Sequence, residues 1–592
     1  MRILFLTHSF NSLTQRLHAE LTQRGHDVSI EFDINDAVTL EAVRLFHPDL
    51  IVAPYLCRAI PEAVWRQHLC LVVHPGVKGD RGPSALDWAI LNGAREWGVT
   101  VLQADAEMDA GPVWASVNFP MRAARKSSLY RNEVTEAAVA AVLQAIDRFA
   151  TGKFIPEHLN ESRSDTRGKW QPLVKQSDRR IDWLADDTQT VLRKIHSADG
   201  FPGIEDALLG VACRLYDACE EDTLRGLPGE IIARRHGAVC RATRDGAVWI
   251  GHVKKIVPGE KTFKLPAVVV LQDKLGAIPE VTVPLDVPPS RLTYRDIRYE
   301  ENAGVGYLHF DFYNGAMSTE QCRCLRAAYL QACRRPTRVI VLMGGPDFWS
   351  NGIHLNCIEA ADSPADESWR NINAMDDLAQ AIIETDSHLT IAALQGNTAA
   401  GGVFLALAAD RLVAREGVVL NPHYKNMGNL YGSEYWSYLL PKRMGEQGRA
   451  IMENRLPLGA TAAKRIGLID DCFGASVNEF AATIKSVAET LARDPAYETL
   501  LEAKRRRRAQ DESVKPLETY RAEELERLKL NFYGFDPSYH VARYNFVFKI
   551  PHSWTPLHLA RHRQRIKNAR PSDADASNRA FSAARRSVLA AD

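Results

Sequence analysis

The chain has 592 residues, too many for a single hydrophobic core, and this length predicts two to four domains. Basic and acidic residues both number 73, so no overall charge recruits nucleic acid or an acidic membrane surface. The sequence has no run of about 20 apolar residues, and its 10 cysteines include no CxxC pair. We therefore expect a cytoplasmic protein with reduced thiols, no metal site, no membrane contact and no nucleic-acid partner.

The first domain is expected to span residues 1–155. Its start, MRILFLTHSF, has too short an apolar run for a signal peptide and is typical of a β-strand. Strands and helices then alternate in βαβ order over the segments 2–6, 12–24, 27–31 and 49–54. This order predicts a parallel sheet, in which ligands bind at the carboxyl ends of the strands. A later strand, Cys70–Val73, leads directly into His74 and should bring it to that edge.

Residues 156–285 are expected to form a small second domain. The stretch 155–185 is crowded with serine, arginine, aspartate and lysine, which is typical of a connecting loop. From Gly229 the sequence GEIIARRHGAVCRATRDGAVWIGHVKK alternates apolar and polar residues and contains His-Gly and Asp-Gly turns. That alternation predicts a compact antiparallel β-domain. The proline-rich stretch Pro284–Pro289 should link it to the next domain.

Residues 286–592 are expected to form a third, α/β domain with a helical extension. Strands are predicted for GVGYLHFDF, TRVIVLMGG and LTIAALQG. The region after Asp470 has a mostly helical pattern, and its last 20 residues are expected to fray. The basic run KRRRR at 504–508 would spread its charge around a helix axis, which favours a solvated helix face over a nucleic-acid site.

The segment from His74 to Gly111 carries the first candidate site. A histidine at the end of a strand can donate to the oxyanion of an acyl-transfer intermediate. Asp109, in the turn Asp-Ala-Gly, can orient the imidazole or relay a proton through water. The alternative is that His74 is an ordinary turn residue with its hydrogen bonds satisfied locally.

Residues 1–155 resemble the formyltransferases that use 10-formyltetrahydrofolate, through HPG, GPSALDWAI, GVTV and MDAGPV in this order. The stretch 229–255 resembles the β-barrel domain that follows the catalytic domain in several of them. The resemblance implies formyl transfer at His74 and Asp109, with the folate ring against the backbone of Tyr55 to Ile60. Val72 departs from the family, which has an asparagine there. A thiol acceptor such as coenzyme A would compensate for the lost amide donor, since a thiol is a better nucleophile than a protonated amine.

Residues 300–480 resemble the crotonase (enoyl-CoA hydratase/isomerase) superfamily, through GVGYLHFDF, MGGPDFWSNGIHL and LQGNTAAGGVFLALAADRLVA. The shared purpose of these segments is an oxyanion hole, which needs two backbone N–H groups with no side chain in the way. By position these donors are Ile353, after Gly352, and Gly401. The alternative is that the glycines serve only close helix packing.

The two glutamates of the hydratases are missing, because Phe404 and Tyr424 stand in their places. Hydratase chemistry is therefore not expected. His423 precedes Tyr424, and Glu434 follows ten residues on. A buried glutamate beside a tyrosine would have a raised pKa and would act as a base or an acid. The alternative is that Tyr424 is a core aromatic with a satisfied hydroxyl.

The order of the two halves, with the segments GDRGPSALDWAI and NPHYKNMGNLYGSEYW, resembles the HypX/HoxX hydrogenase-maturation family. This resemblance implies formyl transfer to coenzyme A and then decarbonylation of formyl-CoA to carbon monoxide. In that scheme Glu434 is the base, Tyr424 orients the formyl group or moves the proton, and Ile353 and Gly401 hold the thioester oxygen. The carbon monoxide would become an iron ligand of a NiFe hydrogenase, whose large subunit or maturation complex would be a partner.

One anchored molecule of coenzyme A would serve both sites by swinging its pantetheine arm, on the order of 20 Å long. An anchor for its phosphates needs cationic and hydroxyl groups. Our candidates are Gln15, Arg131, Ser197 and Arg543, with Arg16 beside the first of them. Two other functions stay open: a formyltransferase with another acceptor fused to an unrelated acyl-CoA enzyme, and a maturation scaffold without turnover.

Overall fold

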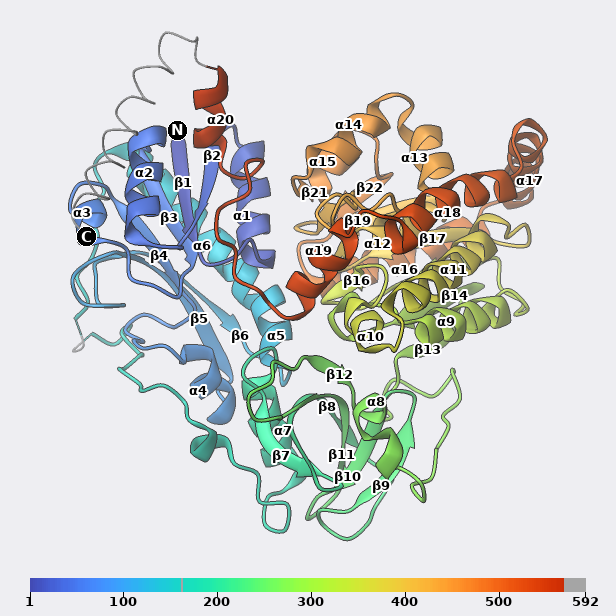
Figure 1. Cartoon of the computed structure of the whole chain (residues 1–592), viewed down its shortest axis with the longest axis horizontal. Helices are drawn as coiled ribbons and strands as arrows, with labels where there is room; N and C mark the ends of the chain where they lie inside the picture. The colour runs from blue at the N-terminus through green and yellow to red at the C-terminus, as the bar shows by residue number, and fades with distance from the viewer. Residues whose placement is uncertain (161–162, 569–592) are drawn as a thin grey trace.

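The computed structural model describes residues 1–160 and 163–568, which form three parts in mutual contact (Figure 1). The parts follow the chain as expected, with an N-terminal sheet domain, a middle β-domain and a third α/β part with added helices. The last 20 residues, which we expected to fray, lie outside the described residues. No helix in the described ranges is long and apolar enough to span a bilayer.

The N-terminal part is built on a six-stranded sheet in the order β2-β1-β3-β4-β5-β6. Its strands are β1 (Arg2–Thr7), β2 (Asp27–Phe32), β3 (Leu50–Tyr55), β4 (Cys70–His74), β5 (Glu96–Gln103) and β6 (Val113–Pro120). The first four are parallel, as the βαβ order predicts, whereas β5 and β6 are antiparallel to their neighbours. The connection from β5 to β6 is too short for the crossover that a parallel pair requires.

Helices cover both faces of this sheet. Apolar side chains of α1 (Ser12–Gln23) and α6 (Thr135–Thr151) pack on one face, and those of α2 (Asp36–Phe46) pack on the other. The short helices are α3 (Glu62–Trp65), α4 (Ala85–Leu91), α5 (Lys126–Leu129) and η1 (Tyr130–Val134). His74 ends β4 at the carboxyl ends of the parallel strands, beside the end of β3.

The middle part is an antiparallel sheet in the order β7-β8-β11-β10-β9, with β12 paired to β11. After η2 (Gln176–Arg179) and α7 (Thr188–Ala198) come β7 (Ile204–Leu208), β8 (Val211–Glu221), β9 (Ile231–Arg235), β10 (Ala238–Ala242), β11 (Ala247–Lys255), β12 (Lys264–Pro266), α8 (Ala267–Leu271) and η3 (Gln272–Lys274). The alternation from Gly229 marks β9 to β11. The strands β7 and β8 begin before it and were not predicted.

The third part has a six-stranded sheet, β13-β14-β15-β17-β19-β22, and a four-stranded sheet, β16-β18-β20-β21. The larger sheet contains β13 (Ile297–Asn302), β14 (Val305–Phe310), β15 (Val339–Leu342), β17 (Leu389–Leu394), β19 (Arg411–Arg415) and β22 (Asp471–Phe473). The smaller contains β16 (Phe348–Ser350), β18 (Asn397–Ala399), β20 (Val419–Asn421) and β21 (Leu458–Gly459). The three strands predicted from the sequence are β14, β15 and β17.

The helices of this part cover both sheets and continue into the extension. They are η4 (Tyr313–Gly315), α9 (Thr319–Ala332), α10 (Leu355–Ala360), α11 (Pro364–Ile383), α12 (Gly401–Leu407), α13 (Trp436–Met444), α14 (Gln447–Asn454), α15 (Ala460–Arg465), α16 (Val477–Arg493), α17 (Tyr497–Val514), α18 (Leu517–Tyr533) and α19 (Ser538–Val547). In α17, Lys504 is buried and binds Asp410 at 2.6 Å, while Arg505 and Arg508 pair with neighbouring glutamates. The basic run is thus a helix face as expected, except that Lys504 anchors the helix to the core.

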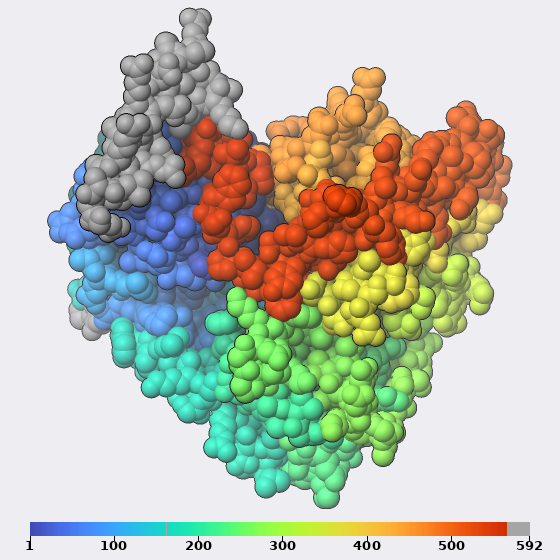
Figure 2. Space-filling view, viewed as in Figure 1, coloured from blue at the N-terminus to red at the C-terminus, as the bar shows by residue number. Residues whose placement is uncertain are grey.

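Residues 550–568, here called the C-terminal strap, run from the third part back to the N-terminal part and end in α20 (Arg561–Asn568). The red trace in Figure 1 follows this course, and Figure 2 shows the strap lying across the surface between the two parts. On the edge strand β2, the Ile30 N–H donates to the Leu559 carbonyl at 3.1 Å. Glu31, fully buried, accepts from Arg563 at 2.8 Å and lies 3.0 Å from His562.

Candidate functional site

His74 is the last residue of β4, and its ring lies between two carboxylates. Nε2 is 2.8 Å from Oδ2 of Asp80, and Nδ1 is 3.6 Å from Oδ1 of Asp109. All three side chains are largely buried. The structure therefore brings His74 and Asp109 together as predicted. Asp80 was missed, although it is the nearest acidic residue after His74 in HPGVKGD.

Two features of the backbone keep the side chains of His74, Asp80 and Asp109 close together. Asp109 has a left-handed φ of 58°, and its Oδ2 accepts the Gly82 N–H at 3.3 Å. Gly76 leaves the space for the His74–Asp80 contact, because a Cβ there would lie 2.5 Å from both His74 Nε2 and Asp80 Oδ2. The glycine of HPG is thus required by the close approach of these two side chains.

The group of His74, Asp80 and Asp109 can accept or donate a proton next to the carbonyl carbon of an acyl group. The hydrogen bond to Asp80 fixes the orientation of the imidazole, with Asp109 close to Nδ1, and a fixed orientation is what a general acid or base requires. Oδ1 of Asp80 is buried and has no hydrogen-bond partner among the residues described. Val72 lies two positions before His74 on β4 and so on the same face, where the amide of the related enzymes is absent.

The segment from Tyr55 to Ile60 begins at the carboxyl end of β3, the strand beside β4. Tyr55 is 36% exposed and meets the ring of Tyr130 edge-on, with 6.5 Å between centroids. Burial raises the pKa of Tyr55 to about 12, so it is a neutral hydroxyl. Ile60 is buried in the core of the same part. The predicted folate segment therefore lies at the same edge of the sheet as His74.

In the third part, the paired strands β16 and β18 bring the two predicted oxyanion donors together. A Cβ on Gly352 would lie 3.3 Å from the Gly401 nitrogen, so the two segments nearly touch. The N–H groups of Gly352 and His354 donate to Ser350 and Asn371, whereas those of Ile353 and Gly401 bond to no described residue. Two close, unpaired amides are what an oxyanion hole needs.

Glu434 and Tyr424 meet beside these amides. The Tyr424 hydroxyl donates to Oε2 of Glu434 at 2.5 Å, and a Cβ on Gly401 would lie 2.0 Å from Oε1. Glu434 is 1% exposed; burial, followed by the charge of Asp376, raises its pKa to about 8. Burial also raises the pKa of Tyr424 well above its ordinary value. A carboxyl with this pKa can take up and release a proton near neutral pH.

The positions of the missing hydratase glutamates are filled by an aromatic stack. The rings of Phe404 and Tyr424 are 5.2 Å apart at an angle of 20°. Tyr424 is therefore both a core aromatic and the hydrogen-bond partner of Glu434. Its neighbour His423 is buried with an unpaired Nδ1 among the described residues, and burial lowers its pKa to about 4.

Two of the predicted coenzyme A anchors lie at the boundary between the N-terminal and third parts. Gln15 accepts from the Asn421 side chain at 3.0 Å. Arg131 donates to Asn314 at 2.9 Å, lies 3.6 Å from Asp347 and stacks over the Phe348 ring. Both side chains thus bridge the two parts that carry the candidate sites.

The other anchors are already engaged. Ser197 is fully buried and donates to the Lys194 carbonyl at 2.7 Å within its own helix. Arg543 is 4% exposed and binds Glu359 at 2.7 Å. Arg16 pairs with Glu20 and Glu136. A phosphate would have to displace these partners, just as it would have to displace the partners of Gln15 and Arg131.

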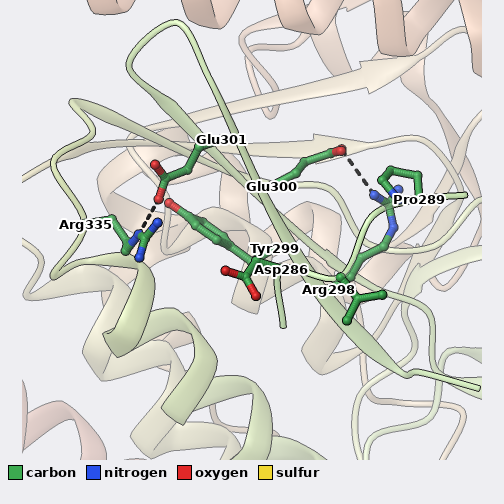
Figure 3. Close-up of a pocket in the computed structure, with 8 residues that line it drawn as sticks. Asp286, Pro289, Arg298, Tyr299, Glu300, Glu301 and Arg335 are labelled. Carbon is green, nitrogen blue, oxygen red and sulfur yellow. Dashed lines mark hydrogen bonds and ion pairs between the residues drawn. The ribbon is translucent and has the colours of Figure 1, made fainter. Parts of the chain in front are cut away.

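A separate pocket of about 220 Å³ opens between the linker and the edge strand β13 (Figure 3). Its charged side chains face one another, with ion pairs between Arg335 and Glu301 and between Arg298 and Glu300. None of the residues that line it belongs to either candidate site, and we assign it no ligand.

The family models that match agree with this division. The formyl transferase family matches residues 34–146, its C-terminal domain matches 173–265, and the enoyl-CoA hydratase/isomerase family matches 300–531. Methionyl-tRNA formyltransferase from Citrifermentans bemidjiense is 27% identical over 39% of this chain and 70% of its own length. The fold and sites thus define a formyl transferase unit joined to a crotonase-fold unit.

The full-length relatives are more specific. The hydrogenase maturation factor HoxX of Bradyrhizobium diazoefficiens is 55% identical, over 96% of this chain and 99% of its own. A crystal structure of HypX from Aquifex aeolicus in complex with tetrahydrofolic acid has a TM-score of 0.92 at 51% identity, covering 95% of this chain and 99% of that one. The chain belongs to the HoxX/HypX family of hydrogenase maturation factors.

Proposed function

We propose that this protein makes carbon monoxide for NiFe-hydrogenase maturation, from 10-formyltetrahydrofolate by way of formyl-CoA. The observation that carries the proposal is the buried Glu434, bonded to Tyr424 and in contact with Gly401 beside two unpaired amides. A hydratase acts on an alkene and uses two glutamates, whereas formyl-CoA has no alkene and needs one base. The related HypX from Aquifex aeolicus binds tetrahydrofolic acid, which supports folate as the formyl donor.

The first step takes place at His74. The coenzyme A sulfur attacks the formyl carbon, a C–S bond forms, the C–N10 bond to folate breaks, and the thiol proton moves to N10. His74 donates to the oxyanion of the intermediate. Its two carboxylate neighbours, Asp80 and Asp109, hold the ring and give the thiol proton a nearby acceptor.

The second step takes place at Glu434. The Ile353 and Gly401 amides hold the thioester oxygen while Glu434 removes the formyl hydrogen as a proton. The C–H electron pair stays on carbon, the C–S bond breaks with its electrons on sulfur, and the sulfur takes the proton back. The products are carbon monoxide and coenzyme A, with no net oxidation or reduction. Tyr424 keeps the Glu434 carboxyl aimed at the substrate.

The test supplies purified protein with 10-formyltetrahydrofolate and coenzyme A, and follows carboxyhaemoglobin formation. His74→Ala should lose carbon monoxide release from 10-formyltetrahydrofolate but keep it from formyl-CoA. Glu434→Gln should accumulate formyl-CoA. Formylation of another acceptor without carbon monoxide would favour a different formyltransferase, and no turnover of either substrate by the wild type would favour a scaffold.

The similarity to HoxX, a hydrogenase maturation factor, supports a hydrogenase as the destination of the carbon monoxide. Carbon monoxide would become a ligand of the hydrogenase iron, and the large subunit or its maturation complex would receive it. This chemistry would take place in the cytoplasm. All 10 cysteines are free, which suits a reducing compartment. Capture of the purified protein by a hydrogenase large subunit tests the partnership.

A further inference from the structure

Three carboxylic side chains from distant parts of the chain meet behind the oxyanion hole. They are Asp376 of α11, Glu434 and Glu524 of α18, each exposed by 1% or less. The hydroxyl of Ser433 lies between two of them, 2.9 Å from Oδ2 of Asp376 and 3.1 Å from Oε2 of Glu524. A serine hydroxyl has one hydrogen, so both contacts are hydrogen bonds only if one carboxyl is protonated.

The same two carboxyls hold an unfavourable turn. Glu434 and Tyr435 are consecutive left-handed residues, with φ of 58° and 59°, a conformation that opposes side chains with a Cβ. The Glu434 N–H donates to Oδ1 of Asp376 at 2.9 Å, and the Tyr435 N–H donates to Oε2 of Glu524 at 3.0 Å. Helices α11 and α18 thereby fix the backbone from which Glu434 reaches Gly401.

Neutral acceptors could also accept from these two N–H groups, so the presence of two carboxyl groups needs its own explanation. Arg521 is the cation near the cluster, but it is 4.0 Å from Asp376 and closer, at 2.8 Å, to Asp377. The other titratable neighbours, Tyr424, Tyr435 and Cys322, bring no positive charge. Burial raises the pKa of Asp376 to about 7 and that of Glu524 to about 8.

We propose that Asp376 and Glu524 are positioning residues for Glu434, which hold its left-handed turn and favour its protonated form by like charge within a cluster buried from solvent. They touch no substrate and act only through Glu434. A base that binds its proton more tightly removes a formyl hydrogen more readily. The inference rests on the proposed function for its purpose, but its physical content concerns the titration of Glu434 alone.

The first experiment needs no turnover. In protein labelled with carbon-13 at the glutamate δ-carbon, the Glu434 signal is the one lost in Glu434→Gln, and its shift is followed against pH. Asp376→Asn keeps the oxygen that accepts the Glu434 N–H and removes the charge. We expect the Glu434 midpoint to fall by roughly one pH unit in Asp376→Asn and in Glu524→Gln. The control is Glu523→Gln, one residue away, where the exposed carboxylate pairs with Lys515.

The second experiment follows carbon monoxide release from supplied formyl-CoA against pH. The rising limb should move to lower pH in both variants, with a lower maximal rate, and stay in place in Glu523→Gln. An unmoved Glu434 midpoint in both variants would overturn the proposal, and so would a wild-type midpoint at the ordinary value for glutamate. The latter result stands even if a variant fails to fold. Absence of carbon monoxide from the wild type, with the Glu434 midpoint displaced as expected, would instead overturn the proposed function.

Discussion

A methyl group on residue 401 would collide with the Glu434 carboxyl. In Gly401→Ala the new Cβ would lie 2.0 Å from Oε1, whereas ordinary contact begins at 3.4 Å. The carboxyl must therefore move by at least 1.4 Å, which is 3.4 minus 2.0. It cannot do so while keeping its 2.5 Å hydrogen bond to Tyr424 on a turn that Asp376 and Glu524 hold.

The expected cost is large for catalysis and moderate for stability. A misplacement of about 1 Å in a reacting group lowers a rate by about 100-fold. An added methyl in a packed core lowers the free energy of unfolding by about 1–3 kcal/mol. We expect carbon monoxide release from formyl-CoA to fall at least to this extent in Gly401→Ala, with formyl transfer at His74 unchanged.

The assay compares carboxyhaemoglobin formation from formyl-CoA with formyl-CoA formation from 10-formyltetrahydrofolate, in the same preparation. Gly276→Ala is the matched control, because a Cβ at that position meets nothing within 4 Å. A Gly401→Ala protein that released carbon monoxide at the wild-type rate would refute the placement of Glu434 as the base.

Four further results are expected. Asp80→Asn should slow formyl transfer by about 10- to 100-fold in a single-turnover assay, since an amide holds the His74 ring less strongly; an unchanged rate would leave Asp109 as the sole partner. Carbon monoxide release by the wild type should rise as the pH increases through about 8, because Glu434 accepts a proton only when ionised; a flat profile from about pH 6 to 9 would contradict this. Arg131→Ala should raise the KM for coenzyme A about tenfold with little change in kcat, and equal effects on both would contradict an anchoring role. Glu31→Gln should lower the free energy of unfolding by about 1–3 kcal/mol in urea titrations at pH 7, because a buried carboxylate with charged partners is lost; the difference should shrink as the pH falls, since hydrogen bonds from His562 and its neighbours outweigh burial and lower the pKa of Glu31.

Local patterns explain how much of the fold was predictable. The βαβ order gave the four parallel strands, and period-two alternation gave β9 to β11, because both depend on neighbours along the chain. The antiparallel pairing of β4 with β5 has no such signal, because a helix lies between these two strands as it would between parallel ones. Likewise β7 and β8 were missed, since polar residues crowd the segment before them.

The residues of the two candidate sites were likewise predictable only where local sequence patterns mark them. His74, Asp109, Ile353 and Gly401 belong to short segments whose spacing reflects the chemistry, and the structure brings each pair together. Asp80 lies six residues after His74. Its side chain reaches His74 only because of the conformation of the turn between them, which the sequence does not specify.

The supporting residues of the second site lie still farther away in sequence. Asp376 and Glu524 approach Glu434 from helices 58 residues before it and about 90 residues after it. No periodic pattern in the sequence predicts a contact between residues so far apart in the chain. Residues that support a catalytic group are therefore harder to predict than the group itself.

The C-terminal strap affects the distance that an intermediate would travel between the two candidate sites. It connects the end of the third part to the edge strand β2 of the first. The three parts therefore all contact one another, instead of being joined only in chain order. These contacts restrain the distance between the two candidate sites. Under the proposed function, a thioester carried on one tethered arm would meet the second site at an effective concentration set by the arm's length, independent of how dilute the protein is. Without the strap, side-chain contacts between the first and third parts, such as that of Gln15 with Asn421, would have to keep the two candidate sites at this distance.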